Sequence, residues 1–134
     1  MKKNLGIIFF KSVDIELGTF LIRELEKIFK KTFTDYELIK KSLQIPSKLY
    51  NKERNQYYSP KLLEILRIQA LNTEFYKLLG IFPDDIYAKL LNFVFGQAEY
   101  GNEAETRAAI ISLIRLKIDV NKNKESFAKQ FGEL

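Results

Sequence analysis

The chain begins with a pattern that limits its fold class, because a continuous apolar run is followed directly by a helical pattern. Residues 5–10 (LGIIFF) are apolar and rich in β-forming side chains, which is typical of a strand buried on both faces. Residues 14–31 carry apolar side chains at helical spacing, with Ser12 or Asp14 available as the N-cap. Residues 33–43 then indicate a second strand. This order predicts a right-handed βαβ unit with two parallel strands.

The rest of the chain predicts further helices and strands. Ser59 and Pro60 are typical of a helix start, with serine as the cap and proline at the first helical position. Gly80 indicates the end of a short helix over residues 73–79. The other expected elements are strands over residues 82–88, 92–100 and 108–116, and a final helix over residues 122–134.

Composition restricts the chemistry of the chain more than its fold. The 134 residues suit one domain, and 46% of them are hydrophobic, as in a packed globule. Cysteine and histidine are both absent, which excludes disulfides, imidazole catalysis and zinc sites built from nitrogen and sulfur ligands of these residues. The apolar run near the N-terminus is far shorter than the ~20 residues that span a bilayer, so we expect a cytoplasmic protein without a membrane partner.

A basic, tyrosine-rich segment over residues 47–63 is the main candidate for binding nucleic acid. The net charge of +5 is spread along the chain without a block of like charges, so charge alone does not locate such a site. Basic side chains interleaved with aromatic rings are typical of proteins that hold single-stranded nucleic acid. The alternative is a surface loop whose tyrosines pack inward. The candidate residues are Lys48, Lys52, Arg54, Tyr57, Tyr58 and Lys61.

Two acidic groupings are the only close sets of carboxylates that could serve a magnesium or calcium ion. They are Asp84 with Asp85, and Glu99 with Glu103 and Glu105. Capping of turns and contact with solvent are the ordinary roles of such residues. The sequence therefore predicts no metal site and no cofactor.

Four stretches of the chain resemble the archaemetzincins, a family of zinc metallopeptidases. They are YNKERNQYYSPKLLEIL (50–66), LLGIFPDDIY (78–87), LNFVFGQAEYG (91–101) and IISLIRL (110–116). The resemblance implies an α+β fold like the N-terminal subdomain of a metzincin. We expect a mixed four- to five-stranded sheet with one antiparallel edge strand and about three helices. Residues 1–134 would form this single subdomain and end within the helix that follows its last strand.

That helix carries the motif His-Glu-x-x-His-x-x-Gly-x-x-His in the family. The resemblance places Gly132 at the position of the first histidine and Glu133 at the position of the general base, and the rest of the motif is absent. Two histidines four residues apart share one helical face and hold one ion, and the glutamate takes a proton from the bound water. Glu133 alone cannot do this. We therefore expect no catalytic residue, no metal and no peptidase activity.

The resemblance implies that such a chain keeps the part of a peptidase that recognises an extended substrate. An extended peptide can add to the antiparallel edge strand as a further strand, through backbone hydrogen bonds. The leading hypothesis is a protein- or peptide-binding pseudoenzyme, which uses this edge or an exposed apolar surface and can form homo-oligomers. The candidate residues are Asn92, Phe93, Val94, Phe95, Gly96, Gln97, Glu99 and Tyr100.

Two alternatives stay open at the level of the sequence. The first is the truncated N-terminal part of an active zinc metallopeptidase, although a clean truncation would have kept histidine at Gly132. The second is a nucleic acid-binding or ribosome-associated protein that uses its scattered lysines.

Overall fold

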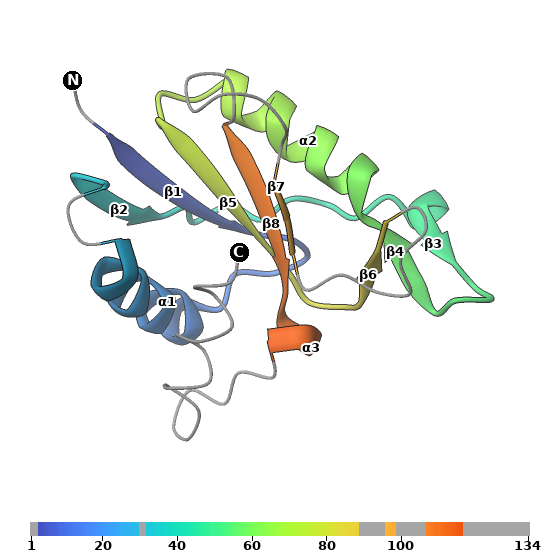
Figure 1. Ribbon diagram of the computed structural model, residues 1–134. Coiled ribbons are helices and arrows are strands. Elements are labelled where there is room, and N and C mark those ends of the chain that lie inside the picture. The colour runs from blue at the N-terminus through green and yellow to red at the C-terminus, as the bar shows by residue number, and fades with distance from the viewer. Residues whose placement is uncertain (1–2, 30–31, 89–95, 99–106, 117–134) are drawn as a thin grey trace.

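A five-stranded mixed sheet forms the centre of the computed structural model, which describes residues 3–29, 32–88, 96–98 and 107–116 (Figure 1). Its strands are β1 (Asn4–Phe9), β2 (Asp35–Leu38), β5 (Lys77–Phe82), β7 (Gly96–Ala98) and β8 (Ala108–Ser112). They lie in the order β2-β1-β5-β8-β7. All neighbouring strands are parallel except β7, which pairs antiparallel with β8 at one edge.

Helices cover both faces of this sheet. Figure 1 shows α1 (Ile15–Phe29) on one face and α2 (Ser59–Leu71) on the other, with the short α3 (Leu113–Leu116) directly after β8. A second sheet, of three short strands, lies beyond one end of the first. It has the order β3-β4-β6, and its strands are β3 (Tyr50–Asn51), β4 (Gln56–Tyr58) and β6 (Ile86–Tyr87). A 3₁₀ turn, η1 (Ser47–Leu49), leads into β3.

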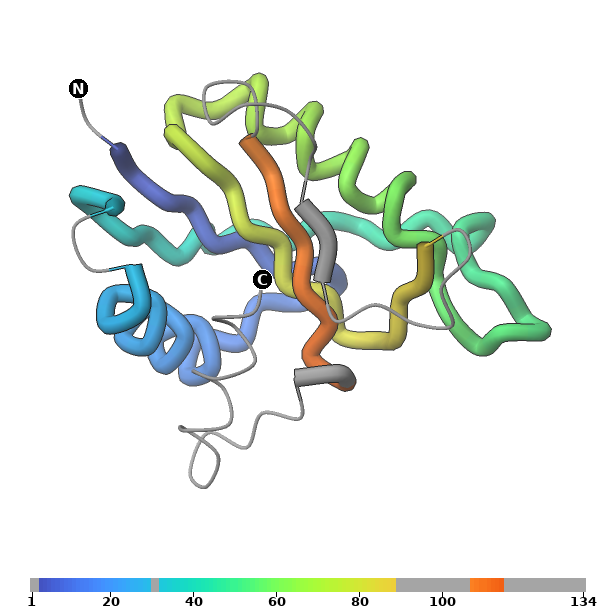
Figure 2. Tube along the Cα trace, viewed as in Figure 1, coloured from blue at the N-terminus to red at the C-terminus, as the bar shows by residue number. Residues whose placement is uncertain are grey.

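The core consists of two layers because side chains along the parallel strands alternate between the two faces. On β1, Leu5, Ile7 and Phe9 belong to the layer under α1, whereas Ile8 belongs to the layer under α2. Residues of β5 and β8 alternate in the same way. The tube in Figure 2 shows these three strands side by side, although they come from the start, the middle and the later part of the chain. The central strands are therefore buried on both sides.

The structure confirms the predicted strand-helix-strand unit and the α+β fold class. β1 pairs parallel with β2, and α1 connects the two strands. Of the two candidate caps, Asp14 fulfils the role, since its carboxylate accepts a hydrogen bond from the backbone N–H of Leu17 at 3.0 Å. The antiparallel edge strand expected within residues 92–100 is β7, and the other residues of that range lie outside the described part of the chain.

The prediction of a short helix over residues 73–79 is wrong. The segment LLGIF instead completes β5, the middle strand of the sheet, which pairs with β1 and β8. Gly80 does not end a helix. Its missing side chain leaves room for Leu66 of α2, which packs directly over this position. Close packing between a helix and a strand, and not helix termination, is the reason for glycine here.

Three smaller expectations also need correction. The N-cap of α2 is Tyr58, and Ser59 is a fully buried first helical residue, with Pro60 following it. The segment before α2 is not only a loop but contains η1, β3 and β4. Residues 108–116 form a strand only as far as Ser112, after which the chain turns into α3.

Further predictions concern the strand over residues 82–88, the final helix and membrane-spanning segments. The strand expected over residues 82–88 is reduced to β6, which joins the small sheet. The expected final helix, with Gly132 and Glu133, lies outside the described residues. Within the described part of the chain, no helix has both the length and the apolar character needed to cross a membrane.

Candidate functional site

The outer side of β7 is the first candidate binding surface. Gly96, Gln97 and Ala98 pair with Ile111, Ile110 and Ala109 of β8, respectively. Among the described residues, no strand pairs with the other side of β7. A strand at the edge of a sheet presents backbone donors and acceptors that a further extended chain can meet.

The opposite edge of the same sheet, β2, differs from β7 in charge. Its four residues include Asp35 and Glu37, and both are exposed. Charged side chains on an edge strand disfavour the addition of another strand. The three residues of β7 carry no charge. Of the two edges, β7 is therefore the one that suits strand addition.

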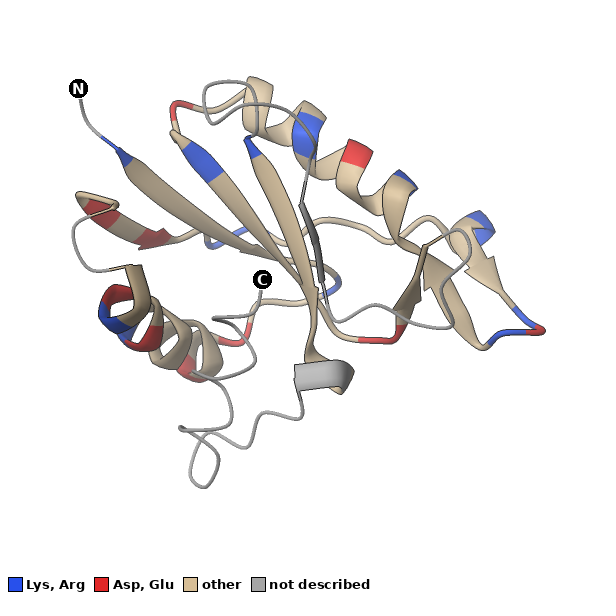
Figure 3. Ribbon diagram, in the orientation of Figure 1, with Lys and Arg blue, Asp and Glu red and all other residues tan. Residues whose placement is uncertain are grey.

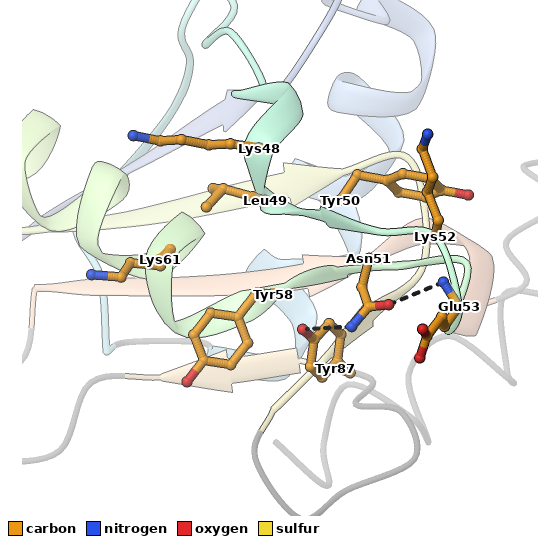
Figure 4. Close-up of a pocket in the computed structure, with 9 residues that line it drawn as sticks. All are labelled: Lys48, Leu49, Tyr50, Asn51, Lys52, Glu53, Tyr58, Lys61 and Tyr87. Carbon is orange, nitrogen blue, oxygen red and sulfur yellow. Dashed lines mark hydrogen bonds between the residues drawn. The ribbon is translucent and has the colours of Figure 1, made fainter.

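A hollow beside the small sheet is the second candidate surface. It has a volume of about 640 Å³, and its walls come from η1, the β3–β4 hairpin, the start of α2 and β6 (Figure 4). Lys48 and Lys61 extend in the same direction on either side of Leu49, while Lys52 and Glu53 lie toward the hairpin turn. The full lining is Lys48, Leu49, Tyr50, Asn51, Lys52, Glu53, Tyr58, Lys61 and Tyr87.

The turn of the hairpin is determined by two asparagines. The side-chain oxygen of Asn51 accepts hydrogen bonds from the backbone N–H groups of Glu53 and Arg54, at 3.1 and 3.2 Å. Asn55 adopts a left-handed conformation with φ 54°, which asparagine tolerates better than most residues. Its side-chain oxygen also accepts a hydrogen bond from the Tyr50 hydroxyl. Local sequence thus holds Lys52 and Glu53 at the tip of the turn.

Buried polar contacts fix the small sheet beneath the hollow. Gln56 is buried and donates a hydrogen bond to the carboxylate of Asp85 at 2.8 Å. The Nε of Arg54 donates to the side-chain oxygen of Gln56 at 3.1 Å, and its guanidinium lies 4.2 Å from the centre of the Tyr87 ring. Arg54 is exposed, but its side chain contacts Gln56 and Tyr87 and thereby supports one wall of the hollow.

Tyr57 joins this sheet to the main core and does not line the hollow. Its ring packs edge-on against Phe82 at a centroid distance of 5.1 Å, and its backbone N–H donates to the carbonyl of Asp85. Burial, followed by the nearby Asp84 carboxylate and Tyr50, raises the pKa of the Tyr57 phenol above its ordinary value. A tyrosine phenol is neutral at physiological pH, and this environment disfavours its ionisation further.

The charges around the hollow are mixed but mainly positive. Lys48, Lys52 and Lys61 line it together with the single acid Glu53. Lys61 is also 3.6 Å from Glu64 on α2, but the two side chains are 61% and 50% exposed. Such exposed pairs contribute little and leave the lysine able to exchange partners. Figure 3 shows that the basic residues of the described part are scattered over several helices, strands and turns, with acidic residues among them.

The residues of this chain do not fit the zinc ion that the resemblance implies. The 134 residues contain no histidine or cysteine, and no three carboxylates gather in the described part. Asp85 caps its own turn through Ile86 and holds Gln56, and the Asp84 carbonyl accepts a hydrogen bond from Ser112. The carboxylate of Asp85 therefore has a structural role, while Glu99, Glu103, Glu105 and Glu133 lie outside the described residues.

The structure thus separates the predicted nucleic-acid residues into two groups. Lys48, Lys52, Tyr58 and Lys61 line one hollow, whereas the exposed Arg54 lies on the Tyr87 ring and the half-buried Tyr57 packs on Phe82. Sequence reasoning missed Tyr87, whose ring packs at a tilt against that of Tyr58, with 5.3 Å between the centroids. Only the pairing of β4 with β6 brings these two tyrosines together.

The sequence also predicts an exposed apolar surface, but the exposed apolar side chains of the described part are more dispersed than the residues of either candidate surface. The large hydrophobic side chains that are most exposed among the described residues come from separate elements. They are Ile15 on α1, Tyr50 on β3, Ile68 and Leu71 on α2, and Ile114 on α3.

Comparison with known proteins gives the same family as the sequence resemblance. The chain is 33% identical over 96 residues to an archaemetzincin of Methanopyrus kandleri, covering 72% of this chain and 51% of that protein. It is 37% identical over 97 residues to an archaemetzincin of Methanocaldococcus jannaschii, covering 72% and 49%. The chain thus spans about half the length of the curated relatives it matches. No protein-family model matches it.

Solved structures agree in fold. The crystal structure of the Methanopyrus kandleri archaemetzincin superposes with a TM-score of 0.74 at 28% identity, over 98% of this chain and 68% of that one. The Archaeoglobus fulgidus archaemetzincin, complexed with malonate, gives 0.65 at 29% identity, over 97% and 70%. A zinc-dependent peptidase from Methanocorpusculum labreanum shares the fold, with a TM-score of 0.69 at 21% identity, over 96% and 75%.

Proposed function

We propose that this archaemetzincin-like chain is a non-catalytic module that binds an extended peptide or protein segment along the outer edge of β7. The observation that carries the proposal is the antiparallel pairing of β7 at one end of the sheet, with no strand on its other side among the described residues. Backbone hydrogen bonds to such an edge give affinity without a specific side-chain pocket.

The relationship to peptidases supports a peptide as the ligand. Relatives named archaemetzincin, and a neighbour named as a zinc-dependent peptidase, share this sheet. A chain that has the sheet but none of the usual nitrogen or sulfur ligands for zinc is suited to hold a peptide without hydrolysing it. Binding along an edge needs only the backbone of the strand and its support by β8.

A titration followed by NMR tests where a peptide binds. The probe is a pool of uncharged, proline-free heptapeptides, added to the uniformly ¹⁵N-labelled chain. We expect amide shifts in β7 and in the paired residues of β8, because a new strand changes the hydrogen bonding of the edge that it joins. The β2 edge of the same sheet is an internal control, since its carboxylates disfavour strand addition.

The location of the shifts decides between the outcomes. Shifts that are confined to β2 or to the β3–β4 hairpin, or an absence of shifts at millimolar peptide, would contradict binding at β7. If β7 and β8 shift and α1 does not, the result supports strand addition over a general change in the fold.

The absence of catalysis has its own test. We expect the purified chain to contain no stoichiometric zinc by mass spectrometry, and to release no product from a fluorogenic peptide with or without added zinc. The reason is that Glu133 has no histidine beside it among these residues to hold the ion. Stoichiometric zinc together with cleavage that a chelator abolishes would refute the non-catalytic part of the proposal. The titration at β7 is read out independently.

A second candidate function is that of a recognition half within a longer zinc peptidase. It is favoured by the finding that the chain matches only about half of its curated relatives. Reading the genomic DNA after the codon for Leu134 in all frames tests it. A continuation rich in histidine and cysteine would favour this candidate, and its absence would favour the independent binding module.

A further inference from the structure

The hollow beside the small sheet is a separate surface from the β7 edge. It lies between η1, the β3–β4 hairpin and the start of α2, whereas β7 lies at the edge of the main sheet (Figures 1 and 4). We propose that this hollow binds single-stranded nucleic acid, with phosphates on its lysines and a base on its tyrosine wall.

The positions of the lysines favour a ligand with several negative charges along its length. Lys48 and Lys61 stand on either side of Leu49, and Lys52 stands nearer the hairpin turn (Figure 4). All three lysines are exposed, so their ammonium groups can follow successive phosphates as mobile point charges. α2 also begins at this wall, and the positive end of its dipole adds to the attraction for anions.

The same lining contains Leu49 and three tyrosine rings. Tyr58 and Tyr87 pack with tilted rings, at a centroid distance of 5.3 Å and an interplanar angle of 49°, and the Arg54 guanidinium lies 4.2 Å from the centre of the Tyr87 ring. The contact with Tyr87 restricts the motion of Tyr58, which lines the hollow and is only half-buried. A ring whose motion is restricted before binding loses less entropy when a base stacks on it. Tyr50, 37% exposed, offers a second ring in the same lining.

These features separate nucleic acid from an acidic peptide as the ligand. An acidic peptide would use the lysines but gain little from the tyrosine rings, because its carboxylates have no flat face to stack. Single-stranded nucleic acid uses both, since every base has a flat face and every link carries a phosphate. The combination of charge and aromatic rings in one hollow is therefore the basis of the assignment.

Fluorescence anisotropy with a labelled oligothymidylate of twelve nucleotides measures the binding and tests the proposal. We expect the double substitution Lys48→Ala with Lys52→Ala to weaken binding roughly 10-fold at low salt. It should also reduce the slope of log K against log salt by about 1.4, because two phosphate contacts are lost. The matched control is Lys40→Ala with Lys41→Ala, which removes the same charge from exposed residues outside the hollow. We expect that control to bind within about 2-fold of the original chain.

Substitution of Tyr58 separates stacking from charge. Tyr58→Phe keeps the ring, and we expect it to bind as the original chain does. Tyr58→Leu keeps apolar volume but removes the flat face, and we expect about 5-fold weaker binding or more. Circular dichroism and thermal melting of each variant establish that the fold is intact.

Three outcomes would overturn the proposal. The first is absence of binding by the original chain at low salt, and the second is equal loss in the hollow variant and in its charge-matched control. The third is that oligoglutamate of equal length displaces the oligonucleotide as well as unlabelled oligothymidylate does, while Tyr58→Leu binds normally. In that case the hollow attracts anions in general and does not recognise bases.

Discussion

Replacing Phe82 by alanine is expected to lower the free energy of unfolding by about 3–5 kcal/mol, which is the usual cost of removing a fully buried aromatic side chain. Phe82 ends β5 and has no exposed surface. Its ring packs edge-on against Phe10 at 5.3 Å and against Tyr57 at 5.1 Å. It is therefore one of the side chains through which the main sheet supports the small sheet.

Urea unfolding monitored by circular dichroism measures this effect. The transition midpoint should fall with little change in slope if the native state keeps its compactness. Ile68→Ala is the control, because that side chain is 50% exposed on α2 and its truncation should change stability by less than about 0.5 kcal/mol. A loss below about 1 kcal/mol for Phe82→Ala would mean that neighbouring side chains refill the space, and that Phe82 does not support the small sheet.

The same substitution should also affect the hollow. Tyr57 would lose its contact with Phe82, and Tyr57 belongs to β4, the middle strand of the small sheet. Tyr58, the next residue, is the ring that we propose for stacking. We therefore expect Phe82→Ala to weaken oligonucleotide binding as well, even though Phe82 does not line the hollow.

The elements that sequence predicted correctly are those with a strong local pattern. β1 is a continuous apolar run, and α1 has apolar side chains at helical spacing after a capping aspartate. Each pattern lies within a segment of about 15 residues or fewer. It can therefore be recognised without knowing which residues pack against it. The resemblance to archaemetzincins supplied the mixed sheet and its antiparallel edge, which no local pattern determines.

The predictions were wrong where packing against a residue that is distant in the sequence determines which amino acid is present. Gly80 was interpreted as the end of a helix, but it is a glycine because Leu66 packs over it. The β3–β4 hairpin was missed because its strands have only two and three residues, too short to show a period.

The candidate hollow shows the same limit. Its lysines and Tyr58 lie within residues 48–61 and could be singled out from the sequence as basic residues near aromatic ones. Tyr87 could not, because it reaches Tyr58 only through the pairing of β4 with β6. The sequence also could not separate Lys52 from Arg54, of which one lines the hollow and the other packs on Tyr87.

The contact between Gly80 and Leu66 provides the second large effect, and a double-mutant cycle measures it. A Cβ atom on residue 80 would lie 2.4, 2.8 and 3.0 Å from Cδ1, Cδ2 and Cγ of Leu66, so the whole leucine side chain would have to move. Leu66 is fully buried and has little space to move into. We expect Gly80→Ala to cost about 1–3 kcal/mol through overpacking, and Leu66→Ala to cost about 2–5 kcal/mol through a cavity.

The double variant should be more stable than the sum of these losses predicts, because the new methyl group enters the space that the leucine leaves. We expect a coupling of about 0.5–3 kcal/mol, measured by urea unfolding of all four proteins. Leu62→Ala is the matched control, since Leu62 is also fully buried on α2 but supplies none of the three atoms nearest to the added Cβ. Combined with Gly80→Ala, it should be additive within about 0.5 kcal/mol. Equal coupling at both leucines would mean that the strain spreads through the layer under α2, and that glycine at position 80 is not explained by Leu66 alone.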